Sequence, residues 1–287
     1  MIQQKSQTKK PDALILEIPS NPGEDATVIT DFIRVYVQNS GCKNIVLGLS
    51  GGVDSATVAV LCQQTLGTAH TFCLFLPDET TPLQDRKHIT LLLKKFKLKC
   101  HEKEITPLVH QMSSTCLLKP DKFALANIKA RIRMALLFEY ANMTKSLVCG
   151  TSNKSEILIG YFTKYGDGGV DIQPIGDLYK TRVYALAKHL KIPSEIIKKP
   201  PTAGLWKNQT DENEIGLDYQ TLDKILYGLE QKRTVENIAA ILSMKKSTVE
   251  HIHQMRKKSQ HKRRTPLIPK LGMRTPGLDW RVPVQEG

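Results

Sequence analysis

No stretch of this 287-residue sequence is apolar enough to cross a membrane, because none approaches the roughly 18 consecutive apolar residues that a spanning helix requires. The N-terminal region offers only the apolar run 13–16 before Glu17 interrupts it, which is too short for the core of a secretory signal. We therefore expect a cytoplasmic protein without a membrane anchor.

Closely spaced cysteine pairs are also missing. No two of the six cysteines form a C-x-x-C pair; they are Cys42, Cys62, Cys73, Cys100, Cys116 and Cys149. This spacing argues against a zinc knuckle, a thioredoxin-type redox pair and the disulfide framework of a secreted domain. We expect reduced cysteines, most of them buried.

Acidic residues are scarce relative to basic ones. The chain has 28 Asp and Glu against 41 Lys and Arg, a formal net charge of +13, which favours anionic partners such as nucleotides, RNA or a membrane surface. The excess is concentrated near the C-terminus, where Glu250 is the single acid between Met244 and Arg274. Residues 265–287 form a proline-containing tail whose role the sequence leaves open.

Apolar residues make up 40% of the chain and occur in short runs that alternate with amphipathic stretches. The pattern predicts strands over 44–50, 70–77 and 145–152 and helices over 55–66, 83–96 and 123–141. Such alternation is typical of the α/β class, with a doubly wound, mostly parallel sheet flanked by helices. After residues 199–212 the sequence becomes helical and polar. We predict a single domain over 1–287 with a helical C-terminal region.

The most informative motif lies where the first predicted strand ends and a helix begins. It comprises Gly48, Leu49, Ser50, Gly51, Gly52, Val53, Asp54 and Ser55. Glycines let a ligand approach the backbone, successive N–H groups can surround an anion, and a helix N-terminus adds partial positive charge. The lysine of a Walker A motif is missing, and so is the G-x-G-x-x-G spacing. Because Asp54 would repel a phosphate unless a cation lay between them, the motif predicts a bridging Mg²⁺.

The segment Ser50–Ser55 resembles the pyrophosphate loop of the N-type ATP pyrophosphatases, which activate a substrate by adenylation. That group includes GMP synthetases, tRNA thiolation enzymes, tRNA lysidine synthetases and NAD synthetases. Further segments resemble the ammonia-dependent NAD synthetases in particular: 150–156, 163–171, 174–180, 201–206, 209–212 and 261–263. The resemblance extends from about residue 29 to about residue 264 in one consistent order.

The resemblance implies an adenine nucleotide alpha hydrolase-like fold and a set of site residues. Mg²⁺ is expected on Asp54 and Glu156. ATP is expected on the loop 48–55 together with Thr151, Lys180 and Thr202. The residues expected to hold the dinucleotide deamido-NAD are Arg131, Lys164, Asp171, His261 and Lys262, with Asp167 as a further contact.

Elementary chemistry agrees with these roles. Glu156 follows a predicted strand end, where ligand groups collect in open α/β sheets, and two carboxylates suit one hard cation. Hydroxyl groups and an ammonium suit the ribose and phosphate oxygens of ATP, and Thr202 keeps the hydroxyl of the serine that many relatives have there. The pyrophosphate of a dinucleotide is negatively charged, so the cations Arg131, Lys164 and Lys262 suit it.

The helix predicted over 123–141 allows a choice between two arginines. At about 100° per residue, Arg131 lies about 60° from the line through Ile128, whereas Arg133 lies about 140° from it. If Ile128 marks the apolar side, Arg131 borders the core and can face a cleft. Arg133 is then expected to be a solvated helix residue outside the site.

The activity implied by the resemblance is the conversion of deamido-NAD to NAD. The nicotinate carboxylate would attack ATP, pyrophosphate would leave, and ammonia would displace AMP from the acyl adenylate. Glutamine-dependent relatives carry an additional amidase domain, for which this chain has no room, so free ammonia is the expected nitrogen donor. A homodimer with its substrate sites near the subunit interface is also implied.

Two other functions remain open from the sequence. A tRNA-modifying adenylating enzyme would fit the loop 50–55 and the net charge, although the cysteine pairs common in thiolation enzymes are missing. Residues 234–249 have the apolar spacing and short turn of a helix-turn-helix, which would suit nucleic acid. A helix pair with a purely structural role is sufficient to explain this segment, so nucleic acid is not an expected partner.

Overall fold

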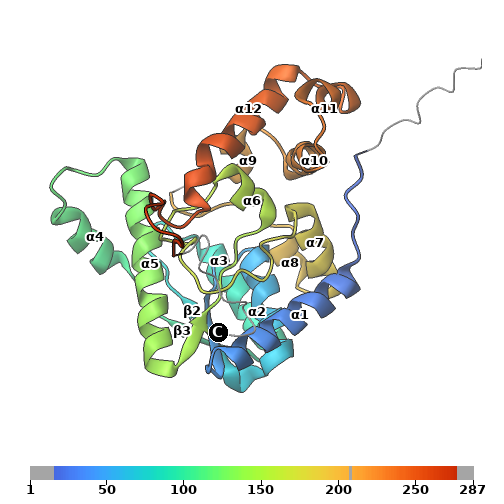
Figure 1. The fold of residues 1–287 in the computed structure, drawn as a ribbon. Helices are drawn as coiled ribbons and strands as arrows, with labels where there is room; N and C mark the ends of the chain where they lie inside the picture. Colours follow the sequence, from blue (N-terminus) through green and yellow to red (C-terminus); the bar gives the residue numbers. More distant parts are fainter. Residues whose placement is uncertain (1–15, 207–208, 277–287) are drawn as a thin grey trace, which may run out of the picture.

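The centre of the molecule is a parallel sheet, seen in a computed structural model that describes residues 16–206 and 209–276 (Figure 1). Among these residues the strands are ordered β3-β2-β1-β4. Their bounds are β1 (Asn44–Gly48), β2 (Thr71–Phe75), β3 (Lys99–Glu102) and β4 (Ser146–Val148). Every pairing is parallel, with Val46 of β1 opposite Phe72 on one side and Val148 on the other. The predicted α/β class is confirmed.

Helices cover both faces of the sheet, as a doubly wound fold requires. One face carries α1 (Pro22–Asn39), α2 (Val53–Leu66), α3 (Leu83–Phe96) and α7 (Lys180–His189). The opposite face carries α4 (Thr106–Ser114) and α5 (Lys122–Thr144). Successive side chains of a strand point to opposite faces. Ile45 and Leu47 therefore join the core around α2, while Val46 joins the core under α5.

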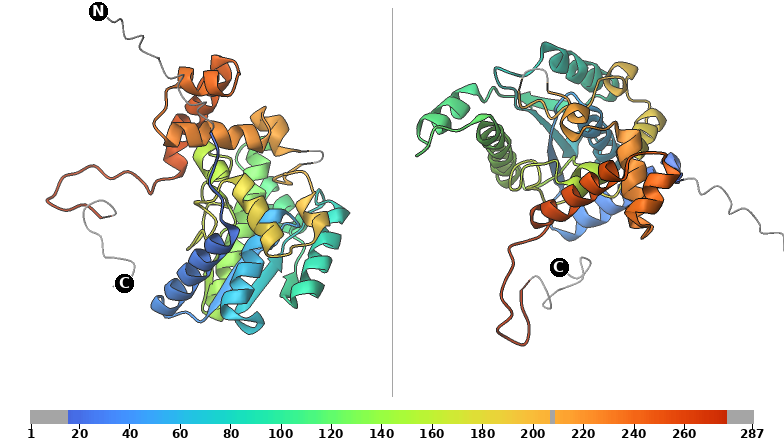
Figure 2. Two further views of the ribbon diagram at one scale, coloured as in Figure 1. Left: turned by 90° about the vertical axis from the view of Figure 1, so that its right-hand side faces the viewer. Right: turned by 90° about the horizontal axis from the view of Figure 1, so that it is seen from above.

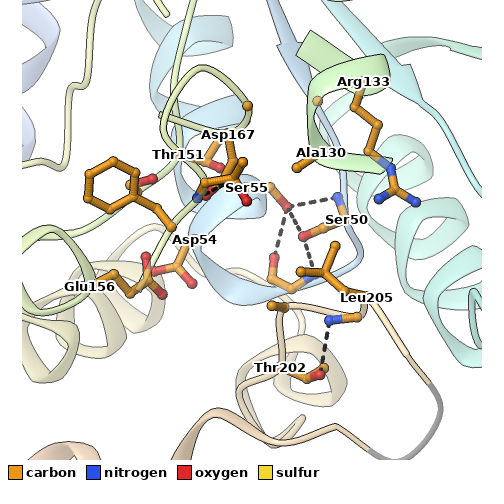
Figure 3. Close-up of a pocket in the computed structure, with 18 of the residues that line it drawn as sticks. Ser50, Asp54, Ser55, Ala130, Arg133, Thr151, Glu156, Asp167, Thr202 and Leu205 are labelled. Atoms are coloured by element: carbon orange, nitrogen blue, oxygen red, sulfur yellow. Dashed lines mark hydrogen bonds between the residues drawn. The ribbon is translucent and has the colours of Figure 1, made fainter. Parts of the chain in front are cut away.

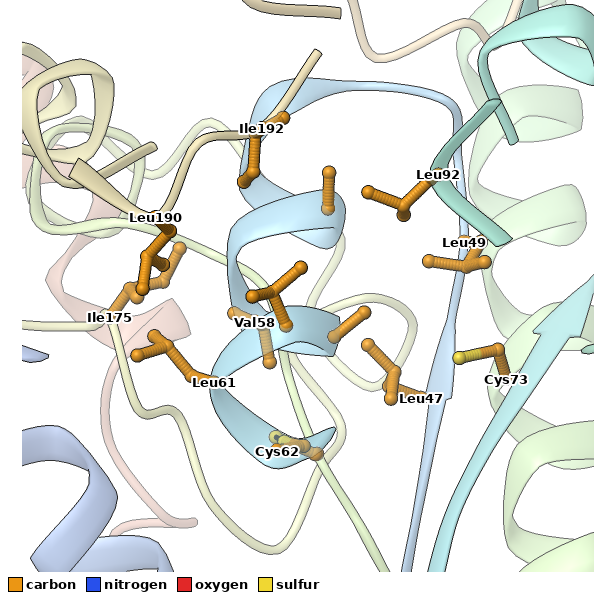
Figure 4. Close-up of a cluster of buried hydrophobic side chains, with 14 of the residues drawn as sticks. Leu47, Leu49, Val58, Leu61, Cys62, Cys73, Leu92, Ile175, Leu190 and Ile192 are labelled. Carbon is orange, nitrogen blue, oxygen red and sulfur yellow. Dashed lines mark hydrogen bonds between the residues drawn. The ribbon is translucent and has the colours of Figure 1, made fainter. Parts of the chain in front are cut away.

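The larger core surrounds α2, which is buried between the sheet and neighbouring helices (Figure 4). Val58, Leu61 and Cys62 are completely buried. Burying each such side chain contributes about 1.5–3 kcal/mol. All six cysteines are free thiols, but only Cys62, Cys73 and Cys149 are buried, so the expectation that most would be buried is wrong.

The predicted elements are present, with shifted ends. α3 has the bounds expected from the sequence, α2 begins two residues earlier, and each strand is shorter than its apolar run. Elements that the sequence did not predict include α1 and the edge strand β3, whose residues are mostly exposed. Of the N-terminal apolar run 13–16 only Leu16 lies within the described residues, and 277–287 of the tail lie outside them. No described helix is long and apolar enough to span a membrane.

A second core joins the C-terminal helices to the rest of the chain. It contains α6 (Lys154–Ile159), α9 (Asp211–Ile215), α10 (Tyr219–Glu230), α11 (Val235–Ile241) and α12 (Lys246–Lys258), which confirms the predicted helical C-terminal region. Figure 2 shows these helices stacked at one end of the molecule, with α1 and α2 at the other. The short helices α8 (Ser194–Ile197), η1 (Thr68–His70) and η2 (Ser259–Lys262) complete the described elements.

The C-terminal segment after α12 is anchored on α6. The guanidinium of Arg263 donates to Ile157 O at 3.0 Å and to Leu158 O at 2.7 Å, so it satisfies carbonyls at the end of a helix that have no partner within it. Gly160 ends α6 in the left-handed region at φ 76°, and a Cβ added there would lie 2.2 Å from Ser259 Cβ. Only glycine allows this contact.

We therefore expect Gly160→Ala to lower the free energy of unfolding by about 2–4 kcal/mol, since it combines backbone strain with a clash against η2. Urea denaturation followed by circular dichroism measures this difference. The control is Gly41→Ala, where φ is 73° and nothing lies within 4 Å of the added atom, so strain alone should cost about 1 kcal/mol. Equal losses of unfolding free energy in Gly160→Ala and Gly41→Ala would contradict the close contact between Gly160 and Ser259.

Candidate active site

A cavity of about 490 Å³ opens at the carboxyl ends of β1, β2 and β4. Its wall includes the loop after β1, the inner side of α5, the N-terminal parts of α6 and α7, and the segment 199–206. Ligands bind at this edge of open α/β sheets because the connecting loops and helix N-termini converge there. In the close-up of Figure 3, Asp54 and Glu156 lie together on one side of the cavity and Arg133 lies on the other.

The loop after β1 has the hydrogen bonds of a preformed anion site. Ser50 N donates to Ser55 Oγ at 3.2 Å, and the two hydroxyls lie 3.1 Å apart. Gly52 N donates to Ser50 Oγ at 3.3 Å, and Gly52 is the N-cap of α2, whose N-terminus faces the cavity. Gly51 has φ 73°, and a Cβ there would lie 2.8 Å from Asp85 Cα. Of the predicted loop residues 48–55, all except Gly51 line the cavity.

A buried cation connects the two predicted metal ligands. Lys180 is only 2% exposed, and its Nζ lies 2.5 Å from Asp54 Oδ2 and 3.4 Å from Glu156 Oε1. Asn153 fixes both carboxylates: its Nδ2 donates to Asp54 Oδ1 at 3.0 Å, and its backbone N donates to Glu156 Oε2 at 3.2 Å. The second bond belongs to a capping box that starts α6.

Burial shapes the ionisation of this group. Desolvation raises the pKa of Glu156 to about 8, opposed by the charge of Lys180 and assisted by that of Asp54. Desolvation would lower the pKa of Lys180, but the charges of Asp54 and Glu156 outweigh it and leave the pKa raised. Lys180 is therefore charged at neutral pH, and the site holds a fixed positive charge between the carboxyl groups of Asp54 and Glu156.

The carboxylates of Asp54 and Glu156 suit a divalent cation, because they converge on one point from two elements and offer the hard oxygen ligands that Mg²⁺ prefers. In the described part of the chain, no group of three or more His, Cys, Asp or Glu side chains is arranged around such a point. A bound Mg²⁺ would thus need further oxygens from phosphate or water, as is usual where it binds with a nucleotide.

More of the residues expected to contact ATP line the cavity than of those expected to contact the dinucleotide. Thr151, Lys180 and Thr202 all line the cavity. Of the five residues expected to hold deamido-NAD, only Lys262 does, and its Nζ donates to Gly160 O at 2.7 Å and Phe162 O at 2.9 Å. Asp167, the further contact, also lines the cavity.

The remaining predicted residues lie outside the cavity wall. Arg131 donates to Lys164 O at 3.4 Å, and Lys164 Nζ donates to His261 O at 2.9 Å, so these three form a chain on the surface. Asp171 accepts a hydrogen bond from Val148 N at 2.7 Å and is exposed. A contact between these four residues and a dinucleotide stays a prediction.

The expectation that Arg133 is a solvated residue outside the site is wrong. Arg133 lines the cavity, and its guanidinium donates to Leu76 O at 2.9 Å and to Asp78 Oδ2 at 3.0 Å, whereas Arg131 is exposed. Ile128 gave the wrong reference direction. The buried side of α5 passes through Ala126 and Ala130, and Arg133 lies about 60° from Ala130.

Sequence reasoning also missed a buried cation on α5, close behind the cavity wall. Lys129 is 3% exposed and its Nζ contacts Asp78 Oδ2 at 3.2 Å, Thr80 Oγ1 at 3.0 Å and Leu205 O at 3.2 Å. It therefore joins α5, the loop after β2 and the segment containing Thr202. Nothing in the sequence distinguishes it from the many surface lysines.

Another missed group lies in the segment 209–214, which the resemblance singled out without assigning a role. Asp211 and Glu214 line the cavity, and Tyr161 OH donates to Glu214 Oε2 at 2.6 Å. Gln209 Nε2 donates to Tyr161 OH at 3.3 Å. These contacts fix the segment against α6 and the residues that follow it.

The parallel sheet, the anion loop at the start of α2 and the carboxylate pair define an adenine nucleotide alpha hydrolase-like fold. The model of the NAD synthase family matches residues 26–266, and the chain belongs to this family. It is 44% identical to the NH(3)-dependent NAD(+) synthetase of Sulfolobus acidocaldarius, over 88% of this chain and 91% of that protein.

Solved structures agree with this assignment. NMN synthetase from Francisella tularensis is 31% identical, with a TM-score of 0.78 over 88% of this chain and 100% of that chain. The glutamine-dependent NAD+ synthetase from Acinetobacter baumannii is 26% identical, with a TM-score of 0.67, and matches 94% of this chain but only 51% of its own length.

We expect Asp54→Asn and Glu156→Gln each to reduce ATP-dependent turnover by at least about 100-fold, because each removes a charge that the leaving pyrophosphate and its cation require. Steady-state kinetics on variants with wild-type circular dichroism measure the effect. Asp31→Asn, an exposed carboxylate on α1, is the control and should retain activity. Near wild-type turnover in either folded site variant would exclude the metal assignment.

The two arginines of α5 should contribute differently to ATP binding, because Arg133 lines the cavity and Arg131 does not. Arg133→Met removes one of the two cations that contact the buried carboxylate of Asp78, and it leaves the Leu76 carbonyl without this hydrogen-bond donor. ATP binding should therefore weaken about tenfold. Arg131→Met removes only an exposed hydrogen bond to Lys164 O and should change the affinity for ATP less than twofold. Calorimetric titration with a non-hydrolysable ATP analogue compares them, and a larger loss of ATP affinity in Arg131→Met than in Arg133→Met would contradict a role for Arg133 in the ATP site.

Proposed function

We propose that this chain is an ammonia-dependent NAD synthetase that amidates the nicotinate carboxylate of deamido-NAD at the expense of ATP. The observation that carries the proposal is the anion loop 48–55 in one cavity with Asp54, Glu156 and Lys180. It is supported by 44% identity to an NH(3)-dependent NAD(+) synthetase over most of both chains.

In the first step the loop 48–55 holds the phosphates of ATP through its backbone N–H groups and the hydroxyls of Ser50 and Ser55. A carboxylate oxygen of deamido-NAD forms a bond to the α-phosphorus, and the bond to the β-phosphate oxygen breaks, releasing pyrophosphate. Lys180 supplies a fixed positive charge beside the reacting phosphates. Mg²⁺, held by Asp54 and Glu156, would neutralise phosphate charge when bound.

In the second step ammonia attacks the carbonyl carbon of the acyl adenylate. The new C–N bond forms, the C–O bond to AMP breaks with its electron pair on the phosphate oxygen, and nitrogen loses a proton. Apolar wall residues such as Phe123, Leu137 and Phe162 limit access of water, which would otherwise hydrolyse the adenylate.

A homodimer and the dinucleotide contacts complete the proposal. Exposed apolar side chains gather on α4, the segment after it and the first turn of α5, and they favour contact with a second copy. They are Leu108, Met112, Leu117, Leu118 and Phe123. We keep Arg131, Lys164, Asp171, His261 and Lys262 as contacts for deamido-NAD. The cytoplasmic location and the single-domain organisation also stay predictions.

A second candidate substrate is the mononucleotide, nicotinate mononucleotide. The observation that favours it is the similarity to NMN synthetase from Francisella tularensis, at 31% identity and a TM-score of 0.78. A tRNA substrate has no comparable support. α11 and α12 form the expected helix pair, but they pack into the second core with α10, as a structural role requires.

The direct test combines the purified chain with ATP, Mg²⁺, ammonium and either deamido-NAD or nicotinate mononucleotide. We expect equal amounts of AMP and NAD from deamido-NAD, with a kcat/KM at least about tenfold above that for the mononucleotide. Glutamine in place of ammonium should give little product, because the relatives that match over most of both chains are NH(3)-dependent NAD(+) synthetases. Preference for the mononucleotide would overturn the assignment of deamido-NAD as the substrate. Efficient use of glutamine, with contaminating glutaminase excluded, would overturn the assignment of ammonia as the nitrogen donor.

A further inference from the structure

A buried histidine contacts the anion loop from behind. His88 lies on α3, is 2% exposed and does not line the cavity. Its Nδ1 lies 3.2 Å from the carbonyl oxygen of Gly51, and its Nε2 lies 2.8 Å from Gln84 Nε2. Because a polar ring is costly to bury without hydrogen bonds, these two partners explain how His88 is accommodated. One of them belongs to the loop expected to bind phosphate.

The two partners define which nitrogen of His88 carries the proton. A carbonyl oxygen only accepts, so Nδ1 is protonated and donates to Gly51 O. The amide nitrogen of Gln84 only donates, so Nε2 accepts from it. Gln84 is exposed, whereas the bond to Gly51 is buried. The arrangement matches an imidazole whose single N–H group is directed at the loop.

The peptide between Gly51 and Gly52 needs such support. Gly51 has φ 73°, and a Cβ there would lie 2.8 Å from Asp85 Cα, so glycine is required where the loop passes over α3. A peptide between two glycines rotates with little steric hindrance. The helix does not fix this peptide either. Gly52 is the N-cap of α2, and its own carbonyl, which accepts from Ala56 N at 3.2 Å, is the first in the helix to do so.

The orientation of this peptide determines whether the loop attracts or repels an anion. The peptide is trans, so its C=O and N–H groups point in opposite directions. While His88 holds the carbonyl of Gly51, the N–H of Gly52 points toward Ser50 Oγ, to which it donates at 3.3 Å. Gly52 and Ser50 line the cavity and Gly51 does not. A rotated peptide would present its carbonyl oxygen to bound phosphate and repel it.

We propose that His88 is a positioning residue for the anion loop. Its Nδ1–H group holds the Gly51–Gly52 peptide with the N–H toward the phosphates of ATP and the carbonyl away from them. The inference deepens the proposed function and rests on it, because that function assigns the loop to ATP. His88 acts through the peptide and does not touch the substrate. The phosphates therefore meet a donor whose direction is fixed before they bind.

The binding test compares variants of His88 that keep or lose the donor. His88→Leu places a carbon near the position of Nδ1, so the Kd for inorganic pyrophosphate with Mg²⁺ should rise about tenfold. His88→Asn carries an amide nitrogen the same number of bonds from the backbone as Nδ1. It should restore the Kd to within about threefold of wild type. Isothermal titration calorimetry on folded variants measures all three chains.

Steady-state kinetics give a result that a merely structural role would not produce. His88→Leu should lower kcat/KM for ATP about tenfold, while the KM for deamido-NAD at saturating ATP stays within about twofold of wild type. The control for stability is Leu92→Val, which removes a buried methylene one turn further along the same side of α3, outside the cavity wall. It should lower stability and leave both kinetic constants within about twofold.

An unchanged affinity of folded His88→Leu for pyrophosphate would overturn the proposal. Equal losses of affinity in His88→Leu and His88→Asn, or equal rises in KM for both substrates, would also overturn it, because the donor would then not be the cause. If His88→Leu does not fold, His88→Phe, which keeps a ring and lacks the donor, replaces it. Failure of the proposed function has a different signature: the wild-type chain would form no NAD from deamido-NAD, while the pyrophosphate titrations would still compare His88 with its variants.

Discussion

The buried ion group of Lys180, Asp54 and Glu156 is the interaction on which the site depends. Its members come from the starts of three helices, α7, α2 and α6, whose sequence separation is large. Removing one member of a buried ion pair costs several kcal/mol, because the partner is left uncompensated. The group therefore couples the packing of α6 and α7 to the geometry of the anion loop.

Neighbouring contacts confirm that this coupling is built into the fold. Asp223 of α10 accepts from Ser155 Oγ and from Thr181 N, so the residues beside Glu156 and Lys180 are held by one buried carboxylate. On the other side of the cavity, Asp78 is held by Lys129 and Arg133. Charged groups on both sides of the cavity are thus paired among themselves.

The sequence predicted the elements whose signal is local. The apolar run before Gly48, the glycine-rich turn and the amphipathic helix at 83–96 each carry their own pattern, and each is found. The edge strand β3 was missed because its exposed residues, Lys99 to Glu102, look like a loop. α5 misled the choice between Arg131 and Arg133 because apolar residues occur around most of its circumference, so no single residue marks the buried side. The roles of Lys129 and Asp211 depend on which distant segments they meet, and spacing along the chain does not contain that information.

The attachment of Arg263 to α6 has a consequence for how the molecule is made. α6 is only six residues long, with Glu156 in its first turn and the carbonyls held by Arg263 at its end. The sheet and the anion loop are complete once the first 150 or so residues have been synthesised, since domains fold progressively as the chain emerges. The last support of Glu156, however, is translated more than a hundred residues after it, at position 263. A nascent chain can therefore form the anion loop well before it has a firmly held carboxylate pair, and the arrangement of Asp54 and Glu156 is among the last features of the protein to form.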